Sequence, residues 1–348
     1  MKNILSKKIR QGRILNAMSL QELADKIGVS KQMISKYEAG MSMPSSKILI
    51  ELAKALGVKI DYFFVSSEIE LGEVNFRKKS SLSQKKIKAL KEQISLRLSG
   101  YLEVEEILQI DNSFDFSKNK KKVELADDIK DLVIRLREQW EIGLDPIHNI
   151  IQLLEDKEIK VIEIDESQSN FDGLSALVNK KYPIIVVNKN FTVERKRFTL
   201  LHELGHLVLD IPHEDIKTQE QLCNRFASEF LFPSSMVIKE FGQQRKIVSK
   251  EELIEVQRKY GLSIRAIVYR LKDCKVISEN SAVEFYKKLN SKPALRNEID
   301  AERFQTPEVS NRFVQLVYRA YAQELISLSK AASLLHVNVN HVLANSVV

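Results

Sequence analysis

Two histidines four residues apart, His202 and His206 in the pentapeptide His-Glu-Leu-Gly-His, constrain this chain more than any other feature. On a helix, residues at i and i+4 project from one face, so both imidazoles can bind one tetrahedral zinc ion. Glu203 stands beside them, where its carboxylate can take a proton from water that the metal activates. Because the chain has only six histidines in 348 residues, this pattern rarely arises by chance, and we expect a metal-binding helix.

A zinc site of this kind needs a third protein ligand and an open fourth position. His213 falls one residue beyond the third histidine of the longer pattern H-E-x-x-H-x-x-G-x-x-H, which this chain does not complete. Glu220 is the better candidate, and Asn224, one helical turn later, can support it or a ligand histidine. Glu229 is a rival carboxylate on a different face of that helix. Two nitrogens and one oxygen suit zinc but leave manganese open.

The composition is typical of a helical globular chain. Hydrophobic residues make up 44% and charged residues 29%, with 11 glycines and 7 prolines, which excludes collagen-like, linker-dominated and mostly disordered chains. No apolar run approaches the roughly 20 residues that span a bilayer, and the first residues lack the apolar core of a signal peptide. Cys223 and Cys274 form no C-x-x-C pair, so we expect a cytoplasmic protein without a membrane partner.

Hydrophobic periodicity predicts mostly helices, with a few short strands. Apolar residues recur at helical spacing over about 82–110, 193–209 and 219–232. β-branched runs predict strands at 160–164 and 184–187, and the second of these could pair with an extended substrate. The predicted fold class is therefore mainly α with a small β-sheet (α+β).

Positive charge is concentrated at the N-terminal end of the chain. Residues 1–65 contain 11 Lys and Arg against 5 Asp and Glu, whereas the whole chain has a formal net charge of +7. A basic small domain on a nearly neutral body favours a nucleic-acid partner for that domain, although a solvated basic surface gives the same pattern.

Residues 19–40 have the pattern of two short helices joined by a tight turn. Ser19 and Glu22 match the S-x-x-E pattern of a capping box. Gly28 ends the first helix, and Ser30 caps the second. In such a pair, the second helix can enter a major groove while the first crosses the phosphates. The side chains expected to face DNA are Gln21, Lys31, Gln32, Ser35 and Lys36.

The pattern L-A-x-x-x-G-V-S-x-x-x-I-S-x-x-E-x-G in residues 23–40 resembles the Xre/Cro-type helix-turn-helix family, over about residues 7–64. This resemblance implies a five-helix-type domain that binds double-stranded DNA. Because such domains usually read paired half-sites, it also implies a possible homodimer.

A second resemblance covers about residues 123–240. The segment 195–206, Arg-Lys-Arg-Phe-Thr-Leu-Leu-His-Glu-Leu-Gly-His, followed by E-x-x-C-N-x-F-A-S-x-F-L-x-P, is similar to the ImmA/IrrE family of metallopeptidases. The resemblance implies a zincin-like domain in which His202, His206 and Glu220 bind Zn²⁺ and Glu203 is the catalytic base. The chain has Leu-Phe-Pro where the family usually has Leu-Met-Pro. No motif marks an oxyanion-stabilising group, for which Tyr182 and the downstream histidines are candidates.

Together these features predict four parts of the chain. They are a helix-turn-helix DNA-binding domain at 1–66, a linker and long helix at 67–122, a zinc metallopeptidase domain at 123–245, and a helical region at 246–348. Within the last part, Lys-Ala-Ala-x-x-Leu-x-Val at 330–337 weakly resembles a helix-turn-helix. We expect this piece to pack against the metallopeptidase body rather than to contact DNA.

The two resemblances imply a DNA-binding transcriptional regulator with a zinc-dependent endopeptidase domain. Its substrate would be a repressor-like protein, or the chain itself, in stress, mobile-element or toxin–antitoxin settings. One alternative is a repressor or antitoxin whose zinc domain is a non-proteolytic sensor or interaction module, and another is a broad housekeeping peptidase. The presence of Glu203 between the histidines favours the first hypothesis, because a purely structural zinc site does not need this carboxylate.

Overall fold

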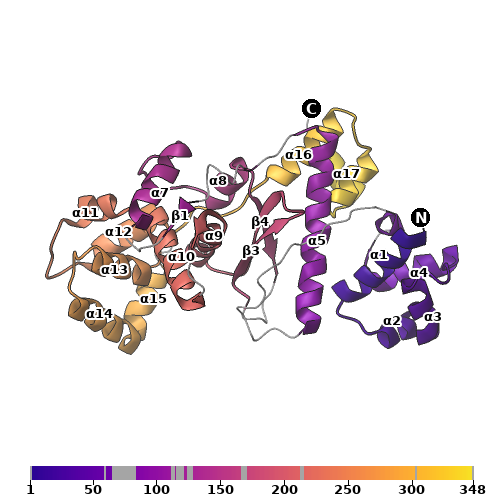
Figure 1. Ribbon diagram of the computed structural model, residues 1–348, viewed down its shortest axis with the longest axis horizontal. Helices are drawn as coiled ribbons and strands as arrows, with labels where there is room; N and C mark the ends of the chain where they lie inside the picture. Colours follow the sequence, from indigo (N-terminus) through magenta and orange to yellow (C-terminus); the bar gives the residue numbers. More distant parts are fainter. Residues whose placement is uncertain are drawn as a thin grey trace. The chain divides into compact units, whose positions relative to one another are not determined.

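The computed structural model describes residues 2–58, 60–64, 84–110, 114, 121–123, 128–165, 171–211, 215–301 and 304–346. The described residues form two compact units. The first contains those up to 64, those at 84–110 and those from Asn311 onward, and the second contains those from 114 to Ser310. The predicted helical region 246–348 is therefore divided between the two units. Mainly helical structure with a small sheet confirms the predicted fold class (Figure 1).

The N-terminal part of the first unit consists of four α-helices and a short 3-10 helix, where a five-helix-type domain is predicted. These elements are α1 (Lys2–Leu15), α2 (Leu20–Ile27), α3 (Lys31–Glu38), α4 (Ser46–Leu56) and η1 (Ile60–Phe63). Their buried side chains form one apolar cluster, whose members include Ile9, Leu23, Ile34, Leu52 and Phe63.

The caps of α2 and α3 follow the predicted pattern. The Ser19 hydroxyl accepts a hydrogen bond from the Glu22 N–H, and the Glu22 carboxylate accepts one from the Ser19 N–H at 2.6 Å. Gly28 adopts φ +70°, a left-handed conformation that favours glycine, and ends α2. The Ser30 hydroxyl accepts from the Met33 N–H at the start of α3. The two helices are thus delimited by local side-chain chemistry that the sequence already contains.

The rest of the first unit is a long helix covered by the C-terminal helices. Helix α5 (Gln84–Ile107) packs against α16 (Arg312–Ala322), α17 (Leu328–Leu334) and α18 (Val339–Ala344) through a second apolar cluster (Figure 1). The predicted packing of the 330–337 piece against the metallopeptidase body is therefore wrong, because its buried side chains lie against α5 and α16.

The second unit is built around a three-stranded sheet with the strand order β2-β4-β3. Strand β2 (Lys160–Ile164) is parallel to the central strand β4 (Tyr182–Asn188), and β3 (Gly173–Val178) is antiparallel to it. Both edges of β4 are occupied, so the predicted pairing of this strand with a substrate is wrong. A separate parallel pair joins β1 (Lys121–Lys122) to β5 (Leu209–Asp210).

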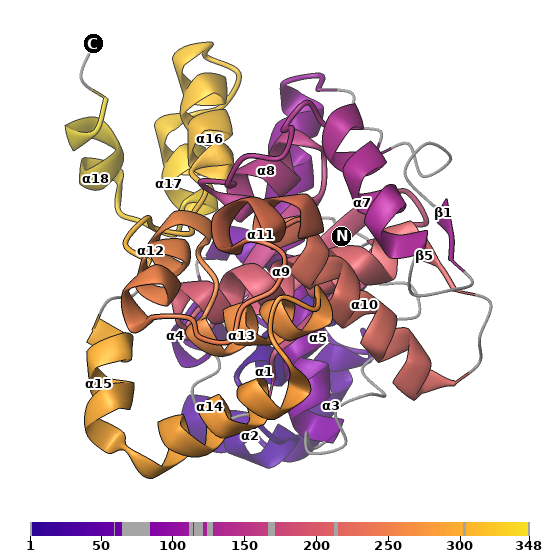
Figure 2. The same ribbon diagram turned by 90° about the vertical axis from the view of Figure 1, so that its left-hand side faces the viewer.

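Helices pack against one face of this sheet, where Ile185 and Val187 of β4 join a large apolar core. Helices α7 (Asp128–Gln139) and α8 (Ile150–Asp156) precede β2, whereas α9 (Val193–Val208) and α10 (Ile216–Leu231) follow β4. Five further helices, drawn in orange in Figure 2, complete the unit: α11 (Ser234–Phe241), α12 (Lys250–Tyr260), α13 (Ile264–Asp273), α14 (Glu279–Ser291) and α15 (Pro293–Ala301). Among the described residues, no helix is both long and apolar enough to cross a membrane.

A buried ion pair fixes α9 from the side of residues 304–310. The guanidinium of Arg197 on α9 lies 2.7 Å from the carboxylate of Glu308, and both side chains are fully buried. The same carboxylate accepts hydrogen bonds from the N–H groups of Ile150 and Ile151 at the start of α8. Glu308 therefore links α8 and α9, both of which lie far from it in the sequence.

Candidate functional site

Helices α9 and α10 bring together the three residues predicted to bind a metal. The Nε2 atoms of His202 and His206 are 3.2 Å apart. The carboxylate of Glu220 lies 3.2 Å from Nε2 of His202 and 3.4 Å from Nε2 of His206. His202 and His206 come from successive turns of α9, as the i, i+4 spacing predicts, and Glu220 comes from the facing α10.

The close approach of α9 and α10 depends on Gly205, the residue before His206. A Cβ atom at this position would lie 3.3 Å from the ring of Phe226 and 3.4 Å from the backbone of Cys223. A Cβ atom here would therefore require its neighbours on α10 to shift by a few tenths of an ångström, and glycine avoids this shift. The start of α10 is fixed by Asp215, whose carboxylate accepts hydrogen bonds from the N–H groups of Lys217 and Thr218. Hydrogen bonds from Thr218 hold the pKa of Asp215 below its ordinary value.

The other nitrogen of each imidazole is occupied by a neighbour from α10. Nδ1 of His202 lies 2.9 Å from Oδ1 of Asn224, so it is the nitrogen that donates when Nε2 is deprotonated. Nδ1 of His206 lies 3.4 Å from Sγ of Cys223. These contacts orient both rings so that their Nε2 atoms face Glu220.

The spacing of these atoms fits a zinc ion. Bonds of about 2.0–2.1 Å at tetrahedral angles place neighbouring ligand atoms about 3.3 Å apart. The two Nε2 atoms are 3.2 Å apart, and the Glu220 carboxylate lies 3.2 Å from His202 through Oε2 and 3.4 Å from His206 through Oε1. All three side chains are partly exposed, so a fourth position toward solvent can admit water or substrate. The donor set of two imidazoles and one carboxylate therefore suits a catalytic rather than a closed structural site.

Glu203 lies beside the three ligand candidates and is held in place by the sheet. Its side chain is 8% exposed, and the Ser175 hydroxyl donates to its Oε2 atom at 3.0 Å. Strand β3 reaches this close because residue 173 is glycine: a Cβ there would lie 2.8 Å from Thr199 and 2.9 Å from the carbonyl oxygen of Val186. The carboxylate is thus positioned from two sides, by its own helix and by β3.

The rival ligand candidates have other surroundings. Glu229 is buried on the far part of α10, where its carboxylate lies 2.6 Å from Arg270 and accepts hydrogen bonds from the N–H and hydroxyl of Ser234. Tyr182 begins β4, with the ammonium of Lys181 over its ring. His213 lies outside the described residues.

Two residues near the metal ligands were not predicted. Ser175 lies on a strand that the periodicity did not indicate, and its contact with Glu203 depends on how the sheet meets α9. Cys223 stands three residues after Glu220, and this helical spacing is the signal that could have placed it near the site.

All five side chains predicted to face DNA are exposed. They belong to the start of α2 and to α3: Gln21, Lys31, Gln32, Ser35 and Lys36. The amide of Gln21 donates to Asp25 at 2.7 Å. Helix α3 is fixed to α1 by Arg13, whose guanidinium makes two hydrogen bonds of 2.6 and 2.8 Å to the carboxylate of Glu38. This ion pair therefore fixes the orientation of α3 relative to α1.

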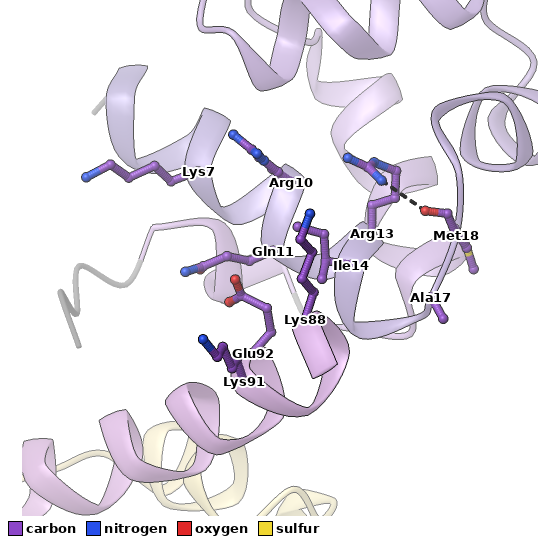
Figure 3. Close-up of a pocket in the computed structure, with 10 residues that line it drawn as sticks. All are labelled: Lys7, Arg10, Gln11, Arg13, Ile14, Ala17, Met18, Lys88, Lys91 and Glu92. Atoms are coloured by element: carbon purple, nitrogen blue, oxygen red, sulfur yellow. Dashed lines mark hydrogen bonds between the residues drawn. The ribbon is translucent and has the colours of Figure 1, made fainter. Parts of the chain in front are cut away.

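A cavity of 610 Å³ lies between α1 and α5 in the first unit (Figure 3). Its cationic side chains are Lys7, Arg10, Arg13, Lys88 and Lys91, with Glu92 as the one carboxylate among the lining residues. These cations add to the positive potential of the first unit, and none of them is among the predicted DNA contacts.

Two family models match separate parts of the chain. The helix-turn-helix model matches residues 9–63. The model of the IrrE N-terminal-like domain of peptidase family M78 matches residues 154–272, which contain the whole group of His202, Glu203, His206 and Glu220. Each match falls within one of the two structural units.

Relatives match the helix-turn-helix part. An uncharacterized transcriptional regulator in the ATPase CF(0) region of Rhodospirillum rubrum is 44% identical over 69 residues, 20% of this chain and 62% of that protein. An uncharacterized HTH-type transcriptional regulator of Methanocaldococcus jannaschii is 36% identical over 66 residues, 19% of this chain and 100% of that protein. The structure of Bacillus thuringiensis PlcR with the peptide PapR7 and DNA aligns with 98% of this chain and 97% of that chain, at 13% identity and a TM-score of 0.19, too low to indicate a shared fold. The chain therefore belongs to the helix-turn-helix family of transcriptional regulators and carries, beyond that domain, an IrrE N-terminal-like domain of the ImmA/IrrE type.

Proposed function

We propose that this chain is a DNA-binding transcriptional regulator whose second unit is a zinc-dependent endopeptidase. The observation that carries the proposal is the pairing of a fitting metal-ligand group with Glu203, a buried carboxylate beside that group. A structural zinc site would need the ligands but not a carboxylate held by Ser175 next to them. The cysteine pattern supports the predicted cytoplasmic location, since Cys223 and Cys274 form no disulfide with each other.

The chemistry follows from the residues that surround the ligand group. When bound by His202, His206 and Glu220, zinc would polarise the scissile carbonyl group and lower the pKa of water. Glu203 takes the proton from the attacking water and returns it to the leaving amine. The Ser175 hydroxyl keeps one carboxylate oxygen oriented, so the other is directed toward the reacting groups. Asn224 keeps the imidazole of His202 in one tautomer.

The substrate is a protein segment in extended conformation. Strand β3 is an edge of the sheet and carries Ser175, so a substrate strand added to this edge would lie next to Glu203. The resemblance to the ImmA/IrrE family favours a repressor-like protein, or this chain itself, as that substrate. Stress responses, mobile-element induction and toxin–antitoxin control are the settings in which such cleavage would regulate transcription.

The peptidase part is tested by comparing the wild type with Glu203→Gln in lysate of the native host. Zinc content and proteolysis are measured for both proteins. The proposal expects equal zinc content and a discrete cleaved protein with the wild type only. If the wild type and Glu203→Gln both bind zinc and give the same cleavage pattern, in lysates taken before and after stress, the result would instead favour a non-proteolytic sensor. Absence of zinc from both proteins would contradict the site itself.

The DNA part is tested by the salt dependence of binding to sheared genomic DNA. Each lost phosphate contact reduces the magnitude of the negative slope of log K against log salt by about 1. Lys36→Ala is expected to weaken binding and lower the slope, because Lys36 is exposed on α3. Lys54→Ala is the matched control, since Lys54 lies on α4 and is paired with Glu51. Equal effects of the two substitutions would refute the assigned DNA surface.

A further inference from the structure

The cavity between α1 and α5 carries more positive than negative charge (Figure 3). Of its five cations, Arg13 is matched by Glu38 of α3, whose carboxylate lies 2.6 Å from it. The other four stand against Glu92, the single carboxylate among the lining residues. These four are Lys7 and Arg10 on α1 and Lys88 and Lys91 on α5. The lining therefore suits a ligand with several negative charges.

Helical spacing turns both groups of cations toward the same space. Lys7 and Arg10 are three residues apart on α1, and each therefore lies on the same face of that helix. The two lysines of α5 have the same spacing. In Figure 3 the side chains of Lys88 and Glu92 extend from α5 toward α1. Two helices that belong to one structural unit thus supply cations to one cavity.

The wall of this cavity is partly removed from water. Burial raises the pKa of Glu92, although the charges of Lys8 and Arg10 oppose this shift. Burial likewise lowers the pKa of Lys8, which the charge of Glu92 opposes. Glu92 thus shares its charge with Lys8 and balances the lining cations only in part. Because charges are screened less where water is excluded, these cations attract an anion more strongly than cations on an open surface do.

The cavity also offers apolar surface and room for more than one phosphate group. Ile14, Ala17 and Met18 belong to its lining, and in Figure 3 Ala17 and Met18 lie on the side away from Lys7. Its volume of 610 Å³ falls within the range of about 300–1,000 Å³ that is typical of small-molecule sites. A matching ligand therefore carries several phosphates, or phosphates joined to an uncharged body.

We infer that this cavity binds a small molecule that carries two or more phosphate groups. Phosphate oxygens accept charge-assisted hydrogen bonds from arginine and lysine, and cations on two helices can hold several of these oxygens at once. Two sources share this chemistry: an inorganic polyphosphate, and a nucleoside polyphosphate whose base would lie against the apolar side. A DNA duplex is too wide to enter the cavity. The inference depends on neither the DNA binding nor the zinc chemistry proposed above.

The test is isothermal titration calorimetry of the full chain with inorganic pyrophosphate, ADP, GDP and adenosine. Pyrophosphate and at least one of the two nucleotides are expected to bind, whereas adenosine, which has no phosphate, is not. A nucleotide that binds at least about tenfold more tightly than pyrophosphate identifies a nucleoside polyphosphate, because the base then buries apolar surface. Similar affinities identify an inorganic polyphosphate.

Two substitutions assign the binding to the cavity. Arg10→Gln and Lys88→Gln change exposed residues on different helices, so one remains informative if the other does not fold. Each is expected to raise the dissociation constant of pyrophosphate at least about tenfold, because a charge-assisted hydrogen bond is lost. Lys54→Gln is the matched control. It removes the same charge from α4, outside the cavity lining, and should leave the affinity unchanged.

Three results would overturn the inference. The first is that neither pyrophosphate nor either nucleotide binds at millimolar concentration; if Arg10→Gln and Lys88→Gln then weaken binding to sheared genomic DNA, the cavity cations contact DNA instead. The second is that both substitutions leave pyrophosphate affinity unchanged, which would place the ligand elsewhere, such as at the metal ligands. The third is that Lys54→Gln weakens binding as much as they do, which would make net charge alone responsible.

Discussion

Replacing Glu308 by alanine should destabilise the second unit through one buried charge. In the native structure the Arg197 guanidinium is fully buried and lies 2.7 Å from the Glu308 carboxylate. Burial lowers the pKa of Arg197, and Glu308 opposes this shift by favouring the charged form. Glu308→Ala leaves the guanidinium with backbone carbonyl partners but without a counter-charge.

The size of the effect follows from the type of contact. Removing one partner of a buried ion pair costs about 3–5 kcal/mol. The N–H groups of Ile150 and Ile151 also lose their acceptor, at about 1–3 kcal/mol for each group that water does not reach. We therefore expect Glu308→Ala to lower the free energy of unfolding by at least about 3 kcal/mol.

Urea unfolding followed by fluorescence measures this loss. The chain has a single tryptophan, Trp140, which is 4% exposed in the core of the second unit and reports on that unit alone. With an m-value of about 2 kcal/mol/M, the midpoint should fall by about 1.5 M. The double variant Arg197→Met with Glu308→Leu should lose less than Glu308→Ala, since no unpaired charge remains. A loss below about 1 kcal/mol for Glu308→Ala, or a greater loss for the double variant, would refute this reasoning.

Three further predictions concern a helix cap, two glycines and the carboxylate of Glu252. Ser19→Ala should cost about 1 kcal/mol of stability in the first unit by thermal unfolding, because it removes the capping-box acceptor, and no change would contradict that role. Gly173→Ala should lower the free energy of unfolding, measured in urea, by about 1–3 kcal/mol. The loss should exceed that for Gly205→Ala, because only at residue 173 would Cβ lie under 3.0 Å from its neighbours; the reverse order would contradict the packing. A hydrogen bond from Arg245 lowers the pKa of Glu252 below its ordinary value of 4.5. The stability that this hydrogen bond contributes is therefore present above pH 4.5 and is lost as the pH falls through the lower pKa of the folded state. Glu252→Gln should thus lose less stability than the wild type on acidification, and parallel pH curves would refute this.

Local chemistry made much of the fold predictable. The strand 160–164 and the helix from Val193 were predicted from periodicity and agree with the structure to within one residue at each end. The turn at Gly28 followed from the need for a left-handed residue there. Each of these features depends on residues close to one another in the sequence.

Features that depend on distant contacts were missed. Strand β3 has little polar–apolar alternation in its sequence, because Ser175 is its one polar residue and Leu177 stands where alternation would place another. Its position depends on its pairing with β4. The contact of Ser175 with Glu203 follows from that sheet. The packing of the C-terminal helices on α5 joins residues more than 200 positions apart, which periodicity does not show.

We propose that His202, His206 and Glu220 form one metal site on this chain. The number of zinc ions per full chain, determined by mass spectrometry of the metal after removal and re-addition of zinc, tests this site. We expect one ion for the wild type and for the control Glu284→Ala, whose carboxylate is exposed on α14. Glu220→Ala should bind zinc at least tenfold more weakly. Equal zinc binding by the wild type and Glu220→Ala, with the fold intact by circular dichroism, would contradict the account.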